Sequence, residues 1–237
     1  MNFTKRVDMD VSKSPHGVIE ATYQALRNRL VKGELRPDTK LKISDISQAM
    51  GVSTGVVREA LTRLGAEGLV SATPQRGFRV APMSAAELQD ITRVRIEIEA
   101  LCIRRSLELG DIEWEASVVG AYHRLQHTPD SVDPTSSLPA QSWTSAHTHF
   151  HDCIVAACDS PWLLKLRDQL HVQSERYRLI AASLIRHDER SLAMEHQAIF
   201  EAVASRDATK AIALISKHFS DTAQGLLERG SEHWLSP

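Results

Sequence analysis

Residues 51–70 read GVSTGVVREALTRLGAEGLV, and their periodicity decides the first half of the fold. Four apolar residues recur at the spacing of one helical stripe: Val57, Ala60, Leu61 and Leu64. Ser53 stands where a helix cap belongs, and Gly68 stands where the helix ends. Gly55 and Arg58 lie roughly opposite the apolar stripe. The stretch therefore predicts a helix with one face in a core and the other face open to a partner.

The segments on either side complete a winged helix-turn-helix. Residues 17–31 show helical periodicity, and a short second helix is predicted over residues 43–50, with Ser44 as its cap. After the third helix, two β-like runs at residues 69–72 and 78–80 enclose a Pro-Gln-Arg-Gly turn. Two helices, a tight turn, a third helix and a hairpin follow one another in the order of a winged helix-turn-helix.

That arrangement is typical of domains that read DNA. A third helix whose inner stripe is held in the core can lay its outer face in the major groove. Gly55 lets the backbone come close to the DNA, and Arg58 can pair with a guanine edge or a phosphate. Arg76 and Gly77, at the hairpin tip, can reach the adjacent minor groove or backbone. The alternative is a small helical domain whose charges simply face water.

The charge of the chain is unevenly placed. The 237 residues carry a net charge of −2, which divides into +5 over residues 1–82 and −7 over residues 83–237. A basic first half suits a polyanionic partner. There is no apolar run of membrane-spanning length and no apolar core of a secretory signal near the N-terminus, and the three cysteines lack CxxC spacing. We expect a cytoplasmic protein that does not enter a membrane.

The second half predicts an all-helical bundle. After Pro82 the periodicity is helical almost throughout, and six helices around one core are expected, so the whole chain is mainly α. Residues 127–141 hold three prolines and many small polar residues, which predicts a mobile loop. The first helix of the bundle is expected to bury one apolar stripe: Leu88, Ile91, Ile98 and Leu101. The expected divisions are a flexible arm, the DNA-binding domain, the helical domain and a tail: residues 1–16, 17–82, 83–230 and 231–237.

Ten of the eleven histidines lie in this helical half. His147 and His151 are four residues apart and share a helical face, whereas His149 points roughly the other way. His196 and His218 fall close to the apolar stripes of two later helices. Four imidazoles from three helices can form a compact nitrogen-ligand site, which suits Zn, Ni, Fe or Cu better than Ca or Mg.

Separate histidines, satisfied in the core or at the surface, are the alternative. Pairs with the spacing of His147 and His151 occur often by chance. His123 and His127 have the same spacing beside the proline-rich loop, where a surface position is expected. The pattern alone leaves both interpretations open.

The first half resembles the DNA-binding domain of GntR-type bacterial transcription regulators. GVSTGVVREALTRLGAEGLV followed by QRGFRV is similar to the family pattern GVSR-x-PVREAL-x-RL-x-x-EGLV followed by RG-x-x-V. The family usually has Arg at the position of Thr54, Pro at that of Val56, and a charged residue where this chain has Ile43 and Ser44. The resemblance implies binding to duplex operator DNA, with contacts from these residues: Ser44, Thr54, Gly55, Arg58, Arg63, Arg76 and Gly77.

The second half resembles the FCD effector domain of the FadR-like subfamily. THFHDCIVAACDSPWL and EHQAIFEAVASRDATKAIALISKHF are similar to its D-x-x-FH-x-x-[IL]-x-x-A-x-x-[NS]-P-x-L and EH-x-x-I-x-x-AI signatures. Metal-binding members use an Asp or Asn and three His, and those three histidines align with His151, His196 and His218. His147 stands at the acidic position, so the chain departs from the family there. The resemblance implies a divalent transition metal, with Zn or Ni expected.

The resemblance also implies a ligand and an assembly. The metal helps to hold a small carboxylate effector, and the regulator binds operator DNA as a homodimer. Arg95 aligns with a family arginine that can contact the acid, while Arg93 and Arg178 are further candidates; for each, a surface ion pair is the alternative. The expected function is a metabolite-responsive transcription regulator, a repressor rather than an enzyme.

A metal-dependent hydrolase with an N-terminal interaction module is the competing hypothesis. Such an enzyme needs a metal-bound water and a nearby general base. The sequence has no HExxH motif, and Glu195, beside His196, points about 100° away from the ligand face of its helix. The regulator interpretation is therefore favoured.

Overall fold

The structure, a computed structural model, describes residues 15–73, 77–129, 141–182 and 192–234. The chain divides into two compact units, one ending at Ser84 and the other running from Ala85 to Leu235. The expected arm lies outside the described residues except for its last two residues, which begin the first helix. Of the expected tail, residues 231–234 are described, and they end the last helix.

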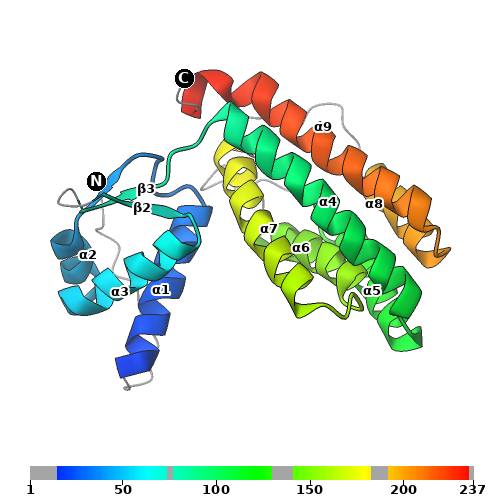
Figure 1. Cartoon of the computed structure of the whole chain (residues 1–237), viewed down its shortest axis with the longest axis horizontal. Helices are drawn as coiled ribbons and strands as arrows, with labels where there is room; N and C mark the ends of the chain where they lie inside the picture. The colour runs from blue at the N-terminus through cyan, green and yellow to red at the C-terminus, as the bar shows by residue number, and fades with distance from the viewer. Residues whose placement is uncertain (1–14, 74–76, 130–140, 183–191, 235–237) are drawn as a thin grey trace. The chain divides into compact units, whose positions relative to one another are not determined.

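Within its described residues, the first unit contains three helices and a small sheet (Figure 1). Its elements are α1 (Pro15–Val31), β1 (Lys40–Leu41), α2 (Ile43–Met50), α3 (Thr54–Ala66), β2 (Val70–Thr73) and β3 (Gly77–Val80). The strands are antiparallel in the order β1-β3-β2, with Arg79 opposite both Lys40 and Ser71. This is the predicted winged helix-turn-helix. The sequence did not predict β1, because a two-residue strand has no periodicity to detect.

Helix α3 forms as its sequence predicts. The Ser53 side chain caps it by accepting a hydrogen bond from the Val56 backbone N–H at 3.4 Å. The whole predicted stripe is fully buried: Val57, Ala60, Leu61 and Leu64. Leu26 and Leu30 of α1 are buried in the same unit, where α1 packs on α3. Burial of each large aliphatic side chain contributes about 1.5–3 kcal/mol, which holds the inner face of α3 in place.

The predicted cap of α2 is wrong. Lys42 precedes the helix without a side-chain cap, and Ser44 lies one residue inside it. The exposed Ser44 hydroxyl hydrogen-bonds the Asp45 carboxylate at 2.9 Å instead of an N–H group of the first turn. The helix still ends at Gly51, whose φ of 65° lies in the left-handed region that glycine adopts at little cost.

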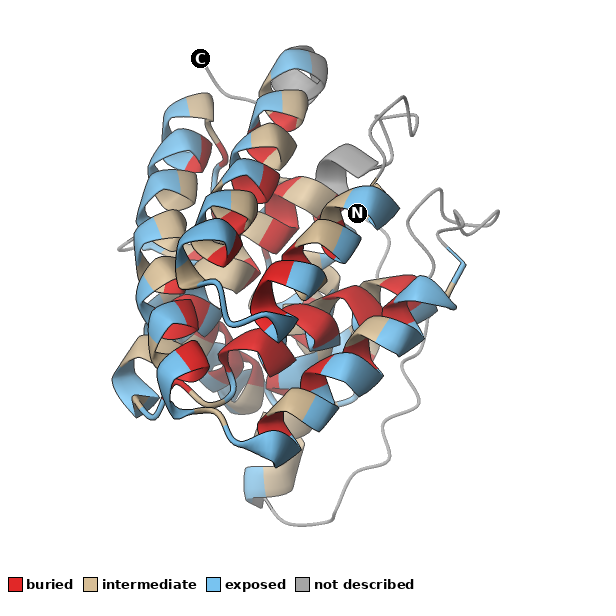
Figure 2. Ribbon diagram, turned by 90° about the vertical axis from the view of Figure 1, so that its right-hand side faces the viewer, coloured by how far each residue is buried: buried red, intermediate tan, exposed pale blue. Residues whose placement is uncertain are grey.

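The second unit is the predicted bundle of six helices within its described residues. They are α4 (Ala85–Leu109), α5 (Ile112–Gln126), α6 (Gln141–Val155), α7 (Pro161–Ala182), α8 (Leu192–Ala204) and α9 (Ala208–Trp234). Helix α4 packs against α7 and α9, α5 packs against α6, and α8 packs against α9. Figure 2 shows the buried faces of these helices turned toward one another and the exposed faces turned to solvent. Residues 130–140 of the expected loop lie outside the described part of the chain.

The stripe predicted for α4 is only partly correct. Leu88 is buried, but 44% of Leu101 is exposed. Farther along, the helix buries a face that includes Glu99 and Cys102. Apolar periodicity cannot identify that face, because its central residue is a carboxylate that is buried together with an arginine. Among the described residues, no helix is both long and apolar enough to cross a membrane.

Candidate metal centre and DNA-binding helix

Three helices of the second unit bring four histidines to one point. His147 and His151 come from α6, His196 from α8 and His218 from α9. One ring nitrogen from each lies within 4.8 Å of those of the other three. All four side chains are buried. We call His147, His151, His196 and His218 the histidine cluster.

The spacing on α6 accounts for half of the histidine cluster. His147 and His151 are one helical turn apart, and their ring centroids are 4.6 Å apart. The packing of α8 on α9 supplies the other half, with the rings of His196 and His218 4.9 Å apart. Trp143 stacks on His147 at 4.8 Å, and Phe219 lies 5.9 Å from His151. Aromatic side chains therefore flank the cluster.

The ring nitrogens of the cluster are suited to binding a metal. Both nitrogens of His151 and the Nδ1 of His147 are buried without a hydrogen-bond partner among the described residues. Burial, reinforced by the neighbouring histidines, lowers the pKa of His147 and of His151 well below the ordinary value of 6.5. Both rings are therefore neutral near pH 7, with lone pairs free for a metal. Leaving a buried polar group unpaired costs about 1–3 kcal/mol, and a bound cation would remove that cost.

Glu195 orients one of the four rings. Its carboxylate oxygen Oε2 lies 2.8 Å from Nδ1 of His218, on the neighbouring helix. A carboxylate at this position accepts a hydrogen bond from Nδ1–H of His218. The other ring nitrogen, Nε2, is then the one available to a metal. The sequence placed Glu195 off the ligand face of its own helix and missed this contact, because the contact depends on how α8 packs on α9.

Three other histidines stay outside the cluster. His149 is exposed and lies near Cys153, with Sγ to Nε2 at 3.6 Å. His123, on α5, and His127, the C-cap of that helix, are exposed, with their rings 4.1 Å apart. The structure thus places all three as the sequence predicts.

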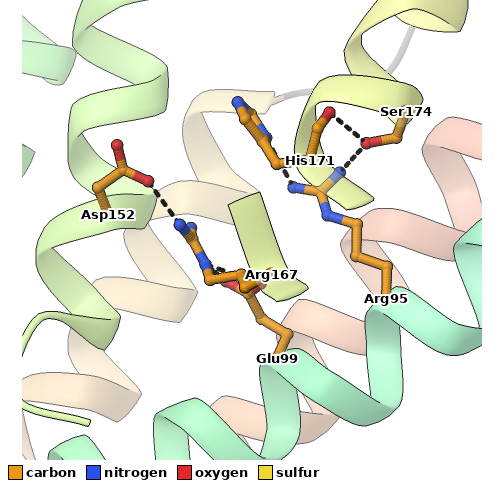
Figure 3. Close-up of polar contacts among 6 residues, drawn as sticks. All are labelled: Arg95, Glu99, Asp152, Arg167, His171 and Ser174. Atoms are coloured by element: carbon orange, nitrogen blue, oxygen red, sulfur yellow. Dashed lines mark hydrogen bonds and ion pairs between the residues drawn. The ribbon is translucent and has the colours of Figure 1, made fainter. Parts of the chain in front are cut away.

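Arg95 lies among the polar side chains of α7 (Figure 3). Its Nη1 donates to Ser174 Oγ at 2.7 Å, and its Nη2 lies 3.2 Å from His171 Nδ1. The guanidinium carbon sits 3.8 Å above the centre of the Phe219 ring. Arg95 therefore lies one aromatic ring away from His151.

Of the other two candidate arginines, Arg93 is far more exposed. About 75% of its side chain is accessible, and it pairs with Asp90 on the same helix. Arg178 is mostly buried, pairs with Glu175, and lies 5.7 Å from the ring of Trp143. Its Nη2 is buried and has no hydrogen-bond partner within the described ranges. Arg178 therefore approaches the His147 side of the cluster, and Arg93 faces solvent.

A buried ion-pair network joins α4, α6 and α7 (Figure 3). Nε of Arg167 donates to both carboxylate oxygens of Glu99, at 3.1 and 3.0 Å, and Nη1 donates to Asp152 at 2.6 Å. Glu99 and Arg167 are only 1% and 6% exposed. The sequence did not predict this network, because its only signal was a charged residue, Glu99, at a helical position that the fold buries.

Helix α3 presents an open face. Thr54, Gly55 and Arg58 are exposed, and Arg58 has no ion-pair partner in the described part of the chain. Arg63 instead pairs with Glu20 at 2.9 Å and lies over the Tyr23 ring at 4.1 Å. Those contacts hold Arg63 against α1.

The remaining DNA candidates lie outside α3. Gly77 is exposed at the start of β3 with a φ of 84°, a conformation that favours glycine. Ser44 is exposed on α2. Arg76 lies outside the described residues. The exposed candidates are thus distributed over α2, α3 and the hairpin.

A winged helix-turn-helix with an open third helix, followed by a helical domain with a buried histidine cluster, defines the class of two-domain bacterial transcription regulators. Residues 18–80 match the gntR family of bacterial regulatory proteins, and residues 90–221 match the FCD domain. The chain belongs to the GntR family and carries an FCD domain, as the sequence predicted.

Two relatives share most of the chain. An uncharacterized HTH-type transcriptional regulator, BphR of Paraburkholderia xenovorans (strain LB400), is 37% identical over 207 residues, which cover 86% of this chain and 83% of BphR. The HTH-type transcriptional repressor GlaR of Escherichia coli (strain K12) is 35% identical over 202 residues, covering 83% of this chain and 90% of GlaR.

Solved structures share the fold. E. coli McbR/YncC matches 89% of this chain and 97% of its own, with a TM-score of 0.73 and 20% identity. A GntR regulator from Rhodococcus sp. RHA1 matches the same shares with a TM-score of 0.68 and 20% identity. At this identity the likeness supports the architecture alone.

Proposed function

We propose that the protein is a metabolite-responsive repressor that binds operator DNA as a homodimer in the cytoplasm and senses a small carboxylic acid at a metal-containing site. The observation that carries this proposal is the convergence of four buried histidines in the domain that follows the DNA-binding unit. The relative GlaR is named a transcriptional repressor, which supports repression, rather than activation, as the effect of this protein on transcription. Binding of the acid shifts the population of conformations that bind DNA.

The DNA contacts follow from the exposed face of α3. Arg58 contacts a guanine edge or a phosphate, while Thr54 and Gly55 let the backbone come close to the groove. The hairpin, through Gly77 and Arg76, contacts the neighbouring backbone or minor groove. Ser44, which is exposed on α2, contacts a phosphate. Arg63 supports the domain through Glu20 and Tyr23.

The histidine cluster holds a divalent transition metal, with Zn or Ni preferred for an all-nitrogen donor set. Bound there, the ion would supply a positive charge for the oxygens of a carboxylate. Arg95 holds the acid from the Phe219 side of the cluster, and Arg178 from the Trp143 side. We assign no catalytic role, because the carboxylate of Glu195 orients His218 and the family consists of transcription regulators.

Helices α4 and α7 offer a surface for the dimer. Five large apolar side chains on their described residues are exposed: Val94, Leu101, Leu109, Trp162 and Leu166. The two helices pack side by side and antiparallel, since Tyr177 contacts Glu87 and Arg167 contacts Glu99. When α4 packs antiparallel against α4 of a second copy, Glu97 of each copy lies opposite Arg104 of the other. That self-complementarity is what a two-fold interface needs.

Light scattering of the purified chain tests the surface. Leu101→Glu places a charge at the centre of the proposed interface and is expected to give monomers at concentrations where the unaltered chain is dimeric. Val119→Glu is the control, because Val119 lies on α5 and its side chain is about as exposed as that of Leu101. This variant is expected to remain dimeric. A Leu101→Glu dimer as tight as the original would rule this surface out.

Gel shifts on the DNA upstream of the gene test the function. The expected result is a complex that weakens steeply with salt, because binding releases counterions from phosphates. Small carboxylates should dissociate the complex between the zinc-loaded chain and DNA, and they should have no effect once a chelator has removed the zinc. Salt-insensitive binding, or acid sensitivity that survives the chelator, contradicts the proposal.

A further inference from the structure

The end of α5 carries a pair of histidines that lies outside the histidine cluster. His123 is in the last turn of the helix, His127 is its C-cap, and both side chains are exposed. Their ring centroids are 4.1 Å apart, and the ring planes are tilted by 37°. The shortest such separation in the histidine cluster is 4.6 Å, between His147 and His151. The exposed rings are therefore closer together than any two rings of the buried cluster.

A hydrogen bond orients one ring of the pair as a metal ligand. Nδ1 of His127 lies 2.8 Å from the backbone carbonyl oxygen of His123. A carbonyl oxygen can only accept, so Nδ1 of His127 carries the proton and its Nε2 keeps a lone pair. Histidines that bind metals almost always donate their second ring nitrogen in this way, to a carboxylate, a backbone carbonyl or water. This contact distinguishes the pair from histidines that share only the spacing of four residues.

The nitrogens that remain are available to an ion. Among the described residues, neither Nε2 of His127 nor either ring nitrogen of His123 has a hydrogen-bond partner. A bond from a metal to an imidazole nitrogen is about 2 Å long, so two nitrogens on one ion lie about 3–4 Å apart. Rings whose centroids are 4.1 Å apart can each place one nitrogen at that separation. The pair can therefore chelate one ion without a change in the helix.

The position at the end of a helix favours a positive ion. The last backbone carbonyls of a helix have no partners within it and give its C-terminus a partial negative charge. Arg124 is a cation in the same turn of α5. Each residue turns a helix by about 100°, so Arg124 projects about 80° away from the midpoint of His123 and His127. An ion held by the two histidines is therefore stabilised by the helix backbone.

The donor atoms indicate which ion binds. Two imidazole nitrogens leave the other coordination positions to water. Cu²⁺ accepts such a mixture of nitrogen and oxygen ligands in tetragonal geometry, and it stands highest in the affinity order of the divalent first-row metals. Structural Zn²⁺ sites almost always have four protein ligands, which the histidine cluster offers and the pair on α5 does not. The two groups of histidines therefore differ in the ion that they favour.

We propose that His123 and His127 form a second metal site, exposed at the end of α5, which binds one Cu²⁺ ion with water in its remaining positions. The site does not depend on the proposed function, because no residue of the histidine cluster or of the DNA-binding unit takes part in it. An ion bound there is open to solvent, so it exchanges more readily than an ion in the buried cluster.

Copper titration of the zinc-loaded full chain at pH 8, followed by electron paramagnetic resonance, tests the proposal. Elemental analysis after gel filtration measures the zinc that is retained, so copper that replaces zinc in the buried cluster is counted separately. We expect one tightly bound Cu²⁺ per chain that displaces no zinc, with the axial spectrum of a tetragonal site and splitting from two nitrogens. Copper that binds only as zinc leaves, or a spectrum without nitrogen splitting, overturns the proposal.

Variants of exposed histidines identify the ligands. His127→Gln and His123→Gln are each expected to weaken copper binding at least about tenfold, because two linked donors hold one ion far more tightly than either donor alone. His149→Gln removes an exposed histidine from α6 and is the control, which should bind copper as the unaltered chain does. Zinc retention and the melting temperature in chelator should be the same in all three variants. Copper affinity that is unchanged in His127→Gln and His123→Gln, or equally weakened in His149→Gln, refutes the site.

Discussion

Replacing His151 by leucine should stabilise the metal-free protein and abolish its response to zinc. His151 is 1% exposed, and neither ring nitrogen has a hydrogen-bond partner among the described residues. Each unsatisfied buried polar group costs about 1–3 kcal/mol. Leucine has a similar volume and no polar atoms, so it removes both costs without opening a cavity. After allowance for imperfect repacking, we expect a gain of about 2 kcal/mol, or roughly 4–8 °C in Tm for a unit of this size.

The zinc response moves the other way. In the unaltered chain, free zinc at about 100 times its Kd adds about 2.7 kcal/mol. Removal of one ligand of the cluster should reduce that gain to near zero. Tryptophan-fluorescence melting, in chelator and in buffered zinc, measures both effects. His149→Leu, on the exposed face of the same helix, is the control and should change neither. A less stable metal-free His151→Leu that still responds to zinc would refute the reasoning, since the ring would then be an ordinary packing residue.

Three further predictions follow from individual contacts. Glu195→Ala removes the partner of His218 Nδ1 and should weaken zinc binding about 10–100-fold in chelator competition; unchanged affinity would show that the contact does not position the ring. Arg58→Ala should weaken operator binding and lower the salt slope by about one, whereas Arg63→Ala should mainly lower the melting temperature of the DNA-binding unit; equal effects of the two on the salt slope would contradict their different placements. Burial and the Glu67 carboxylate raise the pKa of Tyr23 to about 12, so the folded state holds this proton more tightly than the unfolded state does. The free energy of unfolding should therefore fall as the pH rises from about 10 to about 12, and it should fall less steeply in Tyr23→Phe. Urea denaturation at each pH measures it; the same pH dependence in both chains would exclude this contribution.

The sequence by itself determined the local structure. The stripe of Val57, Leu61 and Leu64 requires the inner face of α3 to be buried, and Ser53 provides its cap, so the helix and its open face followed from periodicity alone. The i, i+4 spacing of His147 and His151 likewise placed both rings on one face of α6. These features depend only on the helical repeat of 3.6 residues per turn, which can be recognised within one local segment of the sequence.

Only the tertiary structure decided which faces meet. Periodicity placed His196 and His218 near apolar stripes, but it contains no distance between helices, so the convergence on α6 comes from the packing of α8 and α9. The burial of Glu99 on α4, where the sequence predicted burial of Leu101, has the same origin. The carboxylate can be buried because Arg167, from a helix far along the chain, pairs with it. The engagement of Arg63 with α1 and the bond from Glu195 to His218 are also contacts between elements. Such contacts arise from burial and charge pairing across the folded chain, and no local pattern of residues carries them.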